Sequence, residues 1–381
     1  MPTVKVANVT EDGRWLGPQA RIAKAASKLR AHHDIETVVV CPEKDSERLR
    51  RRLSRAEVGC RTISMHHLTR HVPELIRYVL FFVPEIARLI NVLRDEAVDV
   101  VHCNGPWQIK GMIAAKIVGI PAVWHLNDTR GHSAVQLVFN ILAPVLASAF
   151  IAASRRTEKH YLNESWAKRK RIWIVQAPVD TSQFDPCQTQ PSQAITKYDG
   201  VKIATVGSVN PEKGIGVLVE AANRVQAQRD ETIHFFVVGP IYESQRDYGE
   251  RLQQEVEAED LNVHFLGYRD DIPEILKASD IYVCSSNSEA SPTVVWEAMA
   301  MKLPIVSTDV GDVQDFVEGK EPCGYVVPPR VPEKLAGAIS TLVENFQERR
   351  QFSNRAREIA TSELDLDICA RRHASVYRDL S

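Results

Sequence analysis

The stretch SEASPTVVWEAMA (288–300) places two glutamates, Glu289 and Glu297, on either side of a predicted helix start. Pro292 favours helix entry, because its fixed φ suits the first turn and it lacks an N–H that would need a partner. Free amides at a helix start bind anions, and carboxylates accept hydrogen bonds from hydroxyls. The pattern therefore indicates a site for a molecule that carries both phosphates and hydroxyls. An ordinary helix start with two exposed acids is the alternative.

A second candidate for phosphate chemistry is VGSVNPEKGIGVLVEAANRV (206–225), a strand, a glycine-containing loop and a helix. Lys213 stands at the mouth of that helix, where its ammonium can meet a phosphate that the helix amides also bind. The glycines are wrongly spaced for a dinucleotide fingerprint, and no Ser or Thr follows the lysine as a P-loop requires. A plain strand-to-helix turn with an exposed lysine is the alternative.

The elements that must position these residues are short apolar runs that alternate with helical patterns along the whole chain. Such runs, with few polar residues between the apolar ones, are typical of parallel strands that helices cover on both faces. The runs lie at 4–9, 35–41, 61–65, 98–104, 122–128, 149–154 and 171–178, then at 202–209, 233–240, 263–268, 281–286, 304–309 and 324–329. The sequence thus predicts an α/β protein with two doubly wound domains and ligand sites at the carboxyl ends of the strands.

The length of 381 residues also favours two domains. We expect a first domain over 1–185, a polar linker over 185–200 and a second domain over 200–350, with helices of 351–381 packing back on the first domain. The uncharged stretch 134–153 has the length of a membrane span. Its polar stripe and Pro144 favour instead a buried helix that runs into a buried strand.

These motifs resemble those of the retaining GT-B glycosyltransferases known as family four, or glycosyl transferases group 1. The resemblance is strongest over 200–345, where the lysine loop, LGYRDDIPEIL (266–276) and the spaced glutamates stand in the family's order. It implies two Rossmann-like domains that face each other across a cleft, with the nucleotide sugar held by the second domain and the acceptor by the first.

The resemblance also implies roles for single residues. Lys213 grips the donor diphosphate, Glu289 contacts the donor sugar, and Glu297 contacts the ribose. Gly17, before the first helix, and Ser208, after Gly207, complete the diphosphate site, while Tyr268 and Arg269 lie against the base. The amides at the helix start come from Ser291, Thr293 and Val294. Ser208 stands where family members often carry an arginine, so diphosphate binding depends more on Lys213.

In the first domain, WHLNDTRG (124–131) ends a strand at a place where the family often has a histidine near the reaction centre. We expect His125 to assist catalysis on the acceptor side, with Asn127, Asp128 and Arg130 beside it; a core histidine is the alternative. Two Asp-rich pairs, at 270–271 and 365–367, are not expected to bind metal, because enzymes of this fold stabilise the leaving diphosphate with lysine and amides.

Residues 1–185 carry 27 Lys and Arg against 18 Asp and Glu, although the whole chain has a net charge of −2. The arginine-rich segment 48–55 and the apolar, arginine-containing segment 66–94 favour contact with an anionic membrane surface, and a solvated helix is the alternative. Nucleic acid binding is not expected. The seven scattered cysteines and the absence of a leader pattern predict a cytoplasmic protein, at most peripheral on the membrane.

The sequence therefore predicts a retaining hexosyltransferase. It would move a sugar from a nucleotide diphosphate donor, UDP favoured over GDP, to a glycan or lipid-linked acceptor in polysaccharide assembly. No cofactor or metal is expected. The alternatives are a nucleotide-sugar epimerase of the same fold and a non-catalytic binding subunit.

Overall fold

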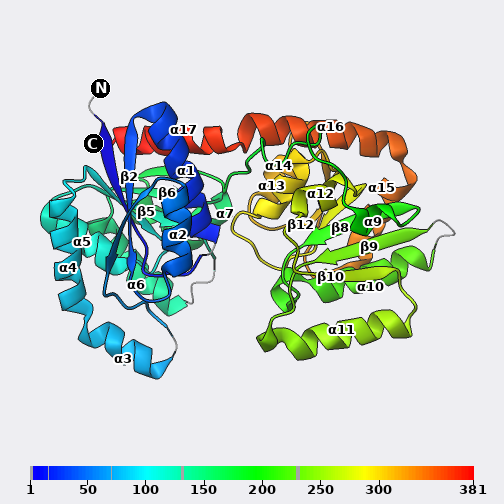
Figure 1. Cartoon of the computed structure of the whole chain (residues 1–381), viewed down its shortest axis with the longest axis horizontal. Coiled ribbons are helices and arrows are strands. Elements are labelled where there is room, and N and C mark those ends of the chain that lie inside the picture. Colours follow the sequence, from blue (N-terminus) through cyan, green and yellow to red (C-terminus); the bar gives the residue numbers. More distant parts are fainter. Residues whose placement is uncertain (1–2, 16, 70, 130–132, 229–231) are drawn as a thin grey trace. The chain divides into compact units, whose positions relative to one another are not determined.

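Figure 1 shows the computed structural model of the chain, which describes residues 3–15, 17–69, 71–129, 133–228 and 232–381. The chain divides into two compact units. The first comprises residues 1–177 and 366–381, and the second comprises residues 178–365. Each unit is built around its own parallel sheet.

The sheet of the first unit has the strand order β3-β2-β1-β4-β5-β6-β7. Its strands are rich in buried Val, Ile and Ala, and all five residues of β4 are buried, as expected for a sheet with helices on both faces. The strands are β1 (Val4–Val9), β2 (Ile35–Pro42), β3 (Gly59–Ile63), β4 (Val100–Asn104), β5 (Ala122–Leu126), β6 (Ala149–Ala152) and β7 (Arg171–Ile174).

Helices cover this sheet, and they include the last helix of the chain. Figure 1 shows that helix, α17, beside α1; Lys28 of α1 pairs with Asp367 of α17 at 2.9 Å, and Arg378 donates to the carbonyl of His33 at 2.7 Å. The helices are α1 (Gly17–His33), α2 (Glu47–Arg55), α3 (Val72–Leu80), α4 (Phe82–Asp95), α5 (Ile109–Val118), α6 (Ser133–Leu146), α7 (Arg155–Tyr161), α8 (Glu164–Ala167) and α17 (Leu366–Arg378).

The expectation of a wholly buried helix over the uncharged stretch 134–153 is wrong for one face of α6. Leu137, Ile141 and Val145 are exposed, while the polar stripe faces inward, where the Asn140 amide donates to the carbonyl of Tyr161 at 3.1 Å. The inward Asn140 finds a partner, whereas the outward apolar side chains remain exposed among the residues that the structure describes. In the part of the chain that the structure describes, no helix combines the length and the hydropathy that a bilayer crossing requires.

The second unit repeats the architecture with the strand order β10-β9-β8-β11-β12-β13. The strands are β8 (Val201–Val206), β9 (Ile233–Val238), β10 (Val263–Gly267), β11 (Ile281–Cys284), β12 (Ile305–Thr308) and β13 (Gly324–Val327). The helices are α9 (Gln193–Thr196), η1 (Pro211–Lys213), α10 (Ile215–Gln226), η2 (Glu243–Gln245), α11 (Arg246–Ala258), α12 (Ile272–Lys277), α13 (Thr293–Ala300), α14 (Val313–Val317), α15 (Pro332–Glu344) and α16 (Phe346–Glu363). The prediction of two doubly wound domains is confirmed.

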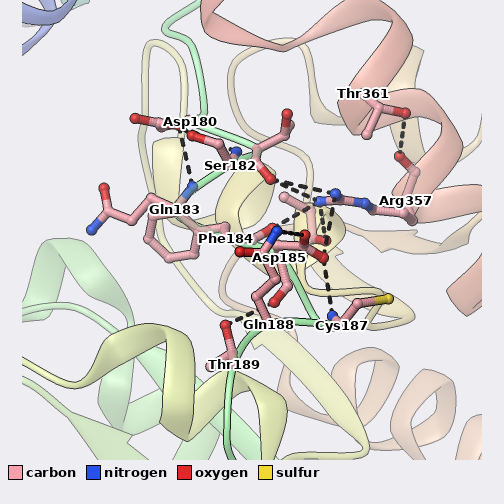
Figure 2. Close-up of polar contacts among 12 residues, drawn as sticks. Asp180, Ser182, Gln183, Phe184, Asp185, Cys187, Gln188, Thr189, Arg357 and Thr361 are labelled. Atoms are coloured by element: carbon pink, nitrogen blue, oxygen red, sulfur yellow. Dashed lines mark hydrogen bonds and ion pairs between the residues drawn. The ribbon is translucent and has the colours of Figure 1, made fainter.

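The boundary between the units differs from the predicted one. The polar stretch 185–200 belongs to the second unit, and of the tail 351–381 only residues 366–381 belong to the first. Figure 2 shows how the segment that opens the second unit is fixed: Asp180 accepts from the amides of Ser182 and Gln183, and Arg357 donates to the carbonyl of Phe184 at 2.7 Å. Side chains that satisfy local backbone groups make this polar segment an ordered part of the fold rather than a linker.

Candidate functional site

The order of the strands reverses between β8 and β11 in the second unit, because the chain continues from β8 to β9 in one direction along the sheet and from β11 to β12 in the other. In doubly wound sheets the ligand site lies at such a switch point, outside the carboxyl ends of the two central strands. The loop after β8 carries Lys213, and the loop after β11 carries Glu289. Lys213 and Glu289 are 76 residues apart in the sequence and meet at this point.

Lys213 and Glu289 form an ion pair, with 2.6 Å between Nζ and Oε1. The same Glu289 oxygen accepts a hydrogen bond from the Ser286 hydroxyl at 3.0 Å. Asn210 holds the lysine loop, since its side-chain oxygen accepts from the Lys213 amide at 2.9 Å. Both charged side chains are partly exposed, so an incoming anion can compete for the lysine.

Backbone contacts fix the two loops against each other. The Ser285 hydroxyl donates to the carbonyl of Lys213 at 2.9 Å, and the amide of Asn287 donates to the carbonyl of Glu212 at 2.7 Å. Gly214 has a φ of +64°, and a Cβ at this position would overlap the carbonyl oxygen of Ser285. Only glycine fits here, which explains why it follows the lysine.

Helix α13 begins at Thr293, directly after the loop that carries Glu289. The predicted anion-binding amides of Ser291, Thr293 and Val294 thus lie at a helix start, and Glu297 lies one turn inside the same helix. Burial, together with the Glu289 carboxylate, raises the pKa of the Cys284 thiol at the end of β11. That thiol stays protonated at neutral pH and is a poor nucleophile.

The remaining donor-side predictions fall at the same edge of the sheet or beside it. Tyr268 follows β10, and its ring is exposed. The Arg269 guanidinium is held by Asp271 through two contacts of 2.7 Å, so it is less available to a base than the tyrosine ring is. Ser208 accepts a hydrogen bond from the Asn210 side chain at 2.9 Å.

The structure contradicts the placement of His125 in an open site. The ring is fully buried in β5, where Nε2 lies 3.1 Å from Nη1 of Arg21 and Nδ1 lies 3.1 Å from Nε2 of His102. In a strand, neighbouring residues point to opposite faces, and the ring of His125 points to the face that α1 and α17 cover. The alternative of a core histidine is therefore the one observed.

The ring nitrogens of His102, His125 and His373 lie within 4.8 Å of one another, close enough by distance alone for a metal. The guanidinium of Arg21 can only donate, so His125 accepts at Nε2, donates through Nδ1 to His102, and His102 in turn donates to the hydroxyl of Tyr377 at 2.7 Å. Burial, together with the positive charge of Arg21, lowers the pKa of all three histidines. Arg21, His125, His102 and Tyr377 thus form one buried chain of hydrogen bonds, and Nδ1 of His373 lies 2.9 Å from the carbonyl oxygen of Cys369.

Two other predicted acceptor-side residues do lie at a cavity of the first unit. Asn127 and Asp128 follow β5 and line a cavity of about 740 Å³. Asp128 accepts a hydrogen bond from the hydroxyl of Tyr161 at 2.8 Å. Arg130 lies outside the described residues. Gly17 is exposed at the start of α1 and does not line this cavity, so its assignment to the diphosphate stays a prediction.

The sequence interpretation missed Glu11, in the loop after β1, and Gln19, in α1, which line the same cavity. Glu11 and Gln19 are both buried polar residues of this lining. The available signal was an acidic residue two positions after an apolar strand, at the switch point between β1 and β4.

Comparison with known proteins agrees with both units. The model described as Glycosyltransferase Family 4 matches residues 17–183, and the model described as Glycosyl transferases group 1 matches residues 189–359. The chain is 26% identical to an Escherichia coli UDP-Gal:alpha-D-GlcNAc-diphosphoundecaprenol alpha-1,3-galactosyltransferase, over 64% of this chain and 69% of that one. It is 26% identical to alpha-maltose-1-phosphate synthase of Mycolicibacterium smegmatis, over 77% and 82%.

Among solved structures, Anabaena HepE in complex with UDP superimposes with a TM-score of 0.82 and 21% identity, over 99% of this chain and 100% of that chain. The fold, the switch-point loops and these matches define a glycosyltransferase of the GT-B class. The chain belongs to the group 1 glycosyltransferases, the family that its motifs resemble.

Proposed function

We propose that this protein is a retaining glycosyltransferase that moves a hexose-type sugar from a UDP-sugar to a hydroxyl of a glycan or lipid-linked acceptor in polysaccharide assembly. The Lys213–Glu289 ion pair at the switch point of the second unit carries this proposal. Support for the nucleotide comes from HepE, whose structures contain UDP, UDP and glucose, or UDP-glucose. Support for a lipid-linked acceptor comes from the name of the E. coli relative.

In this proposal the diphosphate takes the place of Glu289 as the partner of Lys213. The leaving diphosphate gains negative charge as the glycosidic bond breaks, and Lys213 with the amides at the start of α13 stabilises that charge. Glu289, once free of the lysine, accepts hydrogen bonds from hydroxyls of the donor sugar. Glu297 binds the ribose, and the ring of Tyr268 packs on the base.

The acceptor hydroxyl attacks on the face that the diphosphate leaves, and the leaving phosphate takes its proton. No side chain of the described site is assigned as a covalent nucleophile, since the Cys284 thiol is buried and neutral. We propose that no metal takes part, because Lys213 and the helix amides supply the positive charge; turnover in EDTA should equal turnover in buffer.

Turnover and donor affinity of four variants test the site. Lys213→Ala and Glu289→Ala should each lower turnover on the order of 100-fold, because each removes charge stabilisation or sugar contacts at the reacting centre. Glu297→Gln should mainly weaken UDP binding, and Glu333→Gln, a change at a surface acid of the same unit, should alter neither. Near-wild-type turnover of both alanine variants would refute the site assignment.

The anomeric configuration of the product, read by NMR, tests retention. Incubation with UDP-glucose or UDP-galactose alone distinguishes the epimerase, which would yield an isomerised sugar nucleotide without an acceptor. A chain that binds no UDP-, GDP- or ADP-sugar by calorimetry would instead be a non-catalytic subunit.

We also propose peripheral contact with an anionic membrane through α3 and α2. Val72, Ile76 and Val79 of α3 are exposed apolar residues, and the neighbouring α2 exposes a row of arginines. The loop that leads into α2 meets α3, since Lys44 of that loop lies 3.7 Å from Glu74 of α3. An apolar helix face beside a basic one suits the boundary of an anionic bilayer.

Flotation with vesicles of phosphatidylglycerol and phosphatidylcholine tests this contact. The variant Ile76→Asp/Val79→Asp should lose vesicle binding, while Phe346→Asp, at an exposed apolar residue of the second unit, should keep it. Equal flotation of the α3 variant and the wild type would show that α3 does not bind the bilayer.

A further inference from the structure

Two cysteines meet at the edge of the first unit's sheet. Cys41 lies near the end of β2, Cys60 lies in the edge strand β3, and their Sγ atoms are 3.8 Å apart. The structure describes all seven cysteines of the chain, and none of them forms a disulfide. At this distance one thiol can donate a weak hydrogen bond to the other. The two sulfur atoms are therefore close enough to react with each other.

The pairing of the strands puts both side chains on the same face of the sheet. Cys60 is the direct partner of Val39, and Cys41 lies two residues further along β2. Side chains two residues apart in a strand point to the same face. On that face Cys41 belongs to an apolar cluster with Leu49 and Leu53 of α2, and Cys60 packs against this cluster. The contact thus follows from the register of β2 and β3.

The two thiols differ in their access to solvent and in their charge. Cys41 is fully buried, whereas Cys60 is half-buried. The hydrogen bond from the Cys41 thiol, together with the charges of Arg50 and Arg61, lowers the pKa of the Cys60 thiol, although burial opposes this shift. The thiolate is the form of cysteine that attacks oxidants. A small oxidant therefore reacts first with Cys60, and the Cys41 thiol lies directly beside the product.

We propose that Cys41 and Cys60 form a reversible disulfide, which a hydroperoxide produces and an excess of thiol reduces. First, the Cys60 thiolate attacks the hydroperoxide: an S–O bond forms, the O–O bond breaks, and the alkoxide or hydroxide leaves and takes a proton from solvent. Second, the sulfur of Cys41 attacks that of Cys60: the S–S bond forms, the S–O bond breaks, and hydroxide leaves as water with the proton of Cys41. Two thiols lose two electrons, and the hydroperoxide is reduced to an alcohol or water, with one further water.

The register also favours a disulfide that is easily reduced. Cys41 and Cys60 are two residues out of direct pairing, so their Cα atoms lie farther apart than those of directly paired residues. The bond requires a small shift of β3, which is possible for a strand at the edge of the sheet. Strained disulfides are reduced more readily than relaxed ones. The bond therefore forms under peroxide and opens under thiols, unlike a permanent crosslink.

Peptide mapping of the full chain by mass spectrometry tests the pair. The folded protein is treated with hydrogen peroxide, its remaining thiols are blocked with iodoacetamide, and the peptides are separated without reduction. We expect a peptide that joins Cys41 to Cys60 and is lighter than its two parts by two hydrogen atoms. Incubation with excess reduced glutathione before the blocking step should remove this joined peptide. Circular dichroism before digestion verifies that the treated chain is folded.

Three variants separate the roles of the two thiols. Cys60→Ser should lose the joined peptide and leave Cys41 unoxidised, because the remaining thiol is buried. Cys41→Ala should stop after the first step, so that dimedone, a reagent for sulfenic acids, labels Cys60 more strongly than in the wild type. The matched control is Cys187→Ser, which removes the exposed cysteine of the second unit and should leave the joined peptide unchanged.

Three outcomes would overturn the proposal. The first is a folded wild-type chain in which peroxide oxidises the exposed Cys187 but yields no peptide that joins Cys41 to Cys60. The second is a joined peptide that persists in excess glutathione, and the third is a folded Cys60→Ser chain in which dimedone labels Cys41. Mapping of the wild type needs no variant, so it decides the proposal even if Cys41→Ala unfolds. No transferase activity enters the measurement, so its result is independent of the proposed function.

Discussion

Replacement of Glu11 by glutamine should stabilise the protein at alkaline pH and not at acidic pH. Burial, only partly offset by Lys110, raises the pKa of Glu11 from 4.5 to about 7. A raised pKa in the folded state means that the folded chain holds this proton more tightly than the unfolded chain does. The contribution of Glu11 to stability is therefore fully present below pH 4.5 and is lost as the pH rises to about 7.

The size of this effect follows from the shift. One pKa unit corresponds to 1.36 kcal/mol, so charging Glu11 in its buried place costs about 3 kcal/mol above pH 7. Glutamine keeps the shape and cannot ionise. The free energy of unfolding of Glu11→Gln minus that of the wild type should rise by about 2–3 kcal/mol between pH 5 and pH 8, since a smaller part of the loss has already occurred at pH 5.

Urea unfolding followed by tryptophan fluorescence measures this difference, because five of the six tryptophans lie in the first unit. The neighbouring Asp12 is a control of opposite sign. Although burial opposes it, the contacts with Arg14 lower the pKa of Asp12, so Asp12→Asn should lose stability relative to the wild type above pH 4. A difference for Glu11→Gln that stays constant from pH 5 to pH 8 would refute the reasoning about this carboxyl.

Three further changes have expected outcomes. Burial lowers the pKa of His373 from 6.5 to about 4, so the wild type should lose stability as the pH falls from 6.5 toward 4. In this pH range the unfolding free energy of His373→Phe, measured by urea titration, should depend less steeply on pH, by about 1.4 kcal/mol per pH unit. Gly214→Ala should lower both the melting temperature and UDP affinity, because its Cβ would overlap Ser285, whereas Gly337→Ala, with no atom within 4 Å of its Cβ, should change neither by much. Arg357→Met should lower the melting temperature by several degrees through the loss of carbonyl contacts, which include Ala300 at 2.8 Å; an unchanged melting temperature would show that the segment around Phe184 is held by other contacts.

The strands could be predicted from the sequence because parallel strands buried on both faces are short, nearly continuous apolar runs. Each of the thirteen predicted runs contains or overlaps a strand of the structure. The junction of the two units could not be predicted in the same way. Residues 180–189 are polar in composition, yet Asp180 and Asp185 bind nearby amides and order the segment. Composition does not report such side-chain to backbone hydrogen bonds.

The two candidate sites differ in how much the sequence revealed. Lys213 and Glu289 could be proposed as a pair from the sequence because each belongs to a local strand–loop–helix pattern, and the structure brings them together at 2.6 Å. His125 was placed wrongly because one residue of register decides which face of the sheet a side chain meets. Glu11, Gln19 and Lys110 come from separate segments, and their shared burial is visible only after the sheet has brought those segments together.

In the proposed reaction one small site serves both a diphosphate and a sugar, and the contact between Lys213 and Glu289 is central to that double use. The lysine and the glutamate pair with each other at 2.6 Å, so neither is left as an unpaired, partly buried charge. A diphosphate offers the lysine more negative charge than one carboxylate does, so in the proposed reaction its arrival frees the glutamate to accept hydrogen bonds from the hydroxyls of the donor sugar. In the proposed reaction this exchange couples phosphate binding to sugar binding, and Glu289→Gln should separate the two by lowering turnover without weakening UDP.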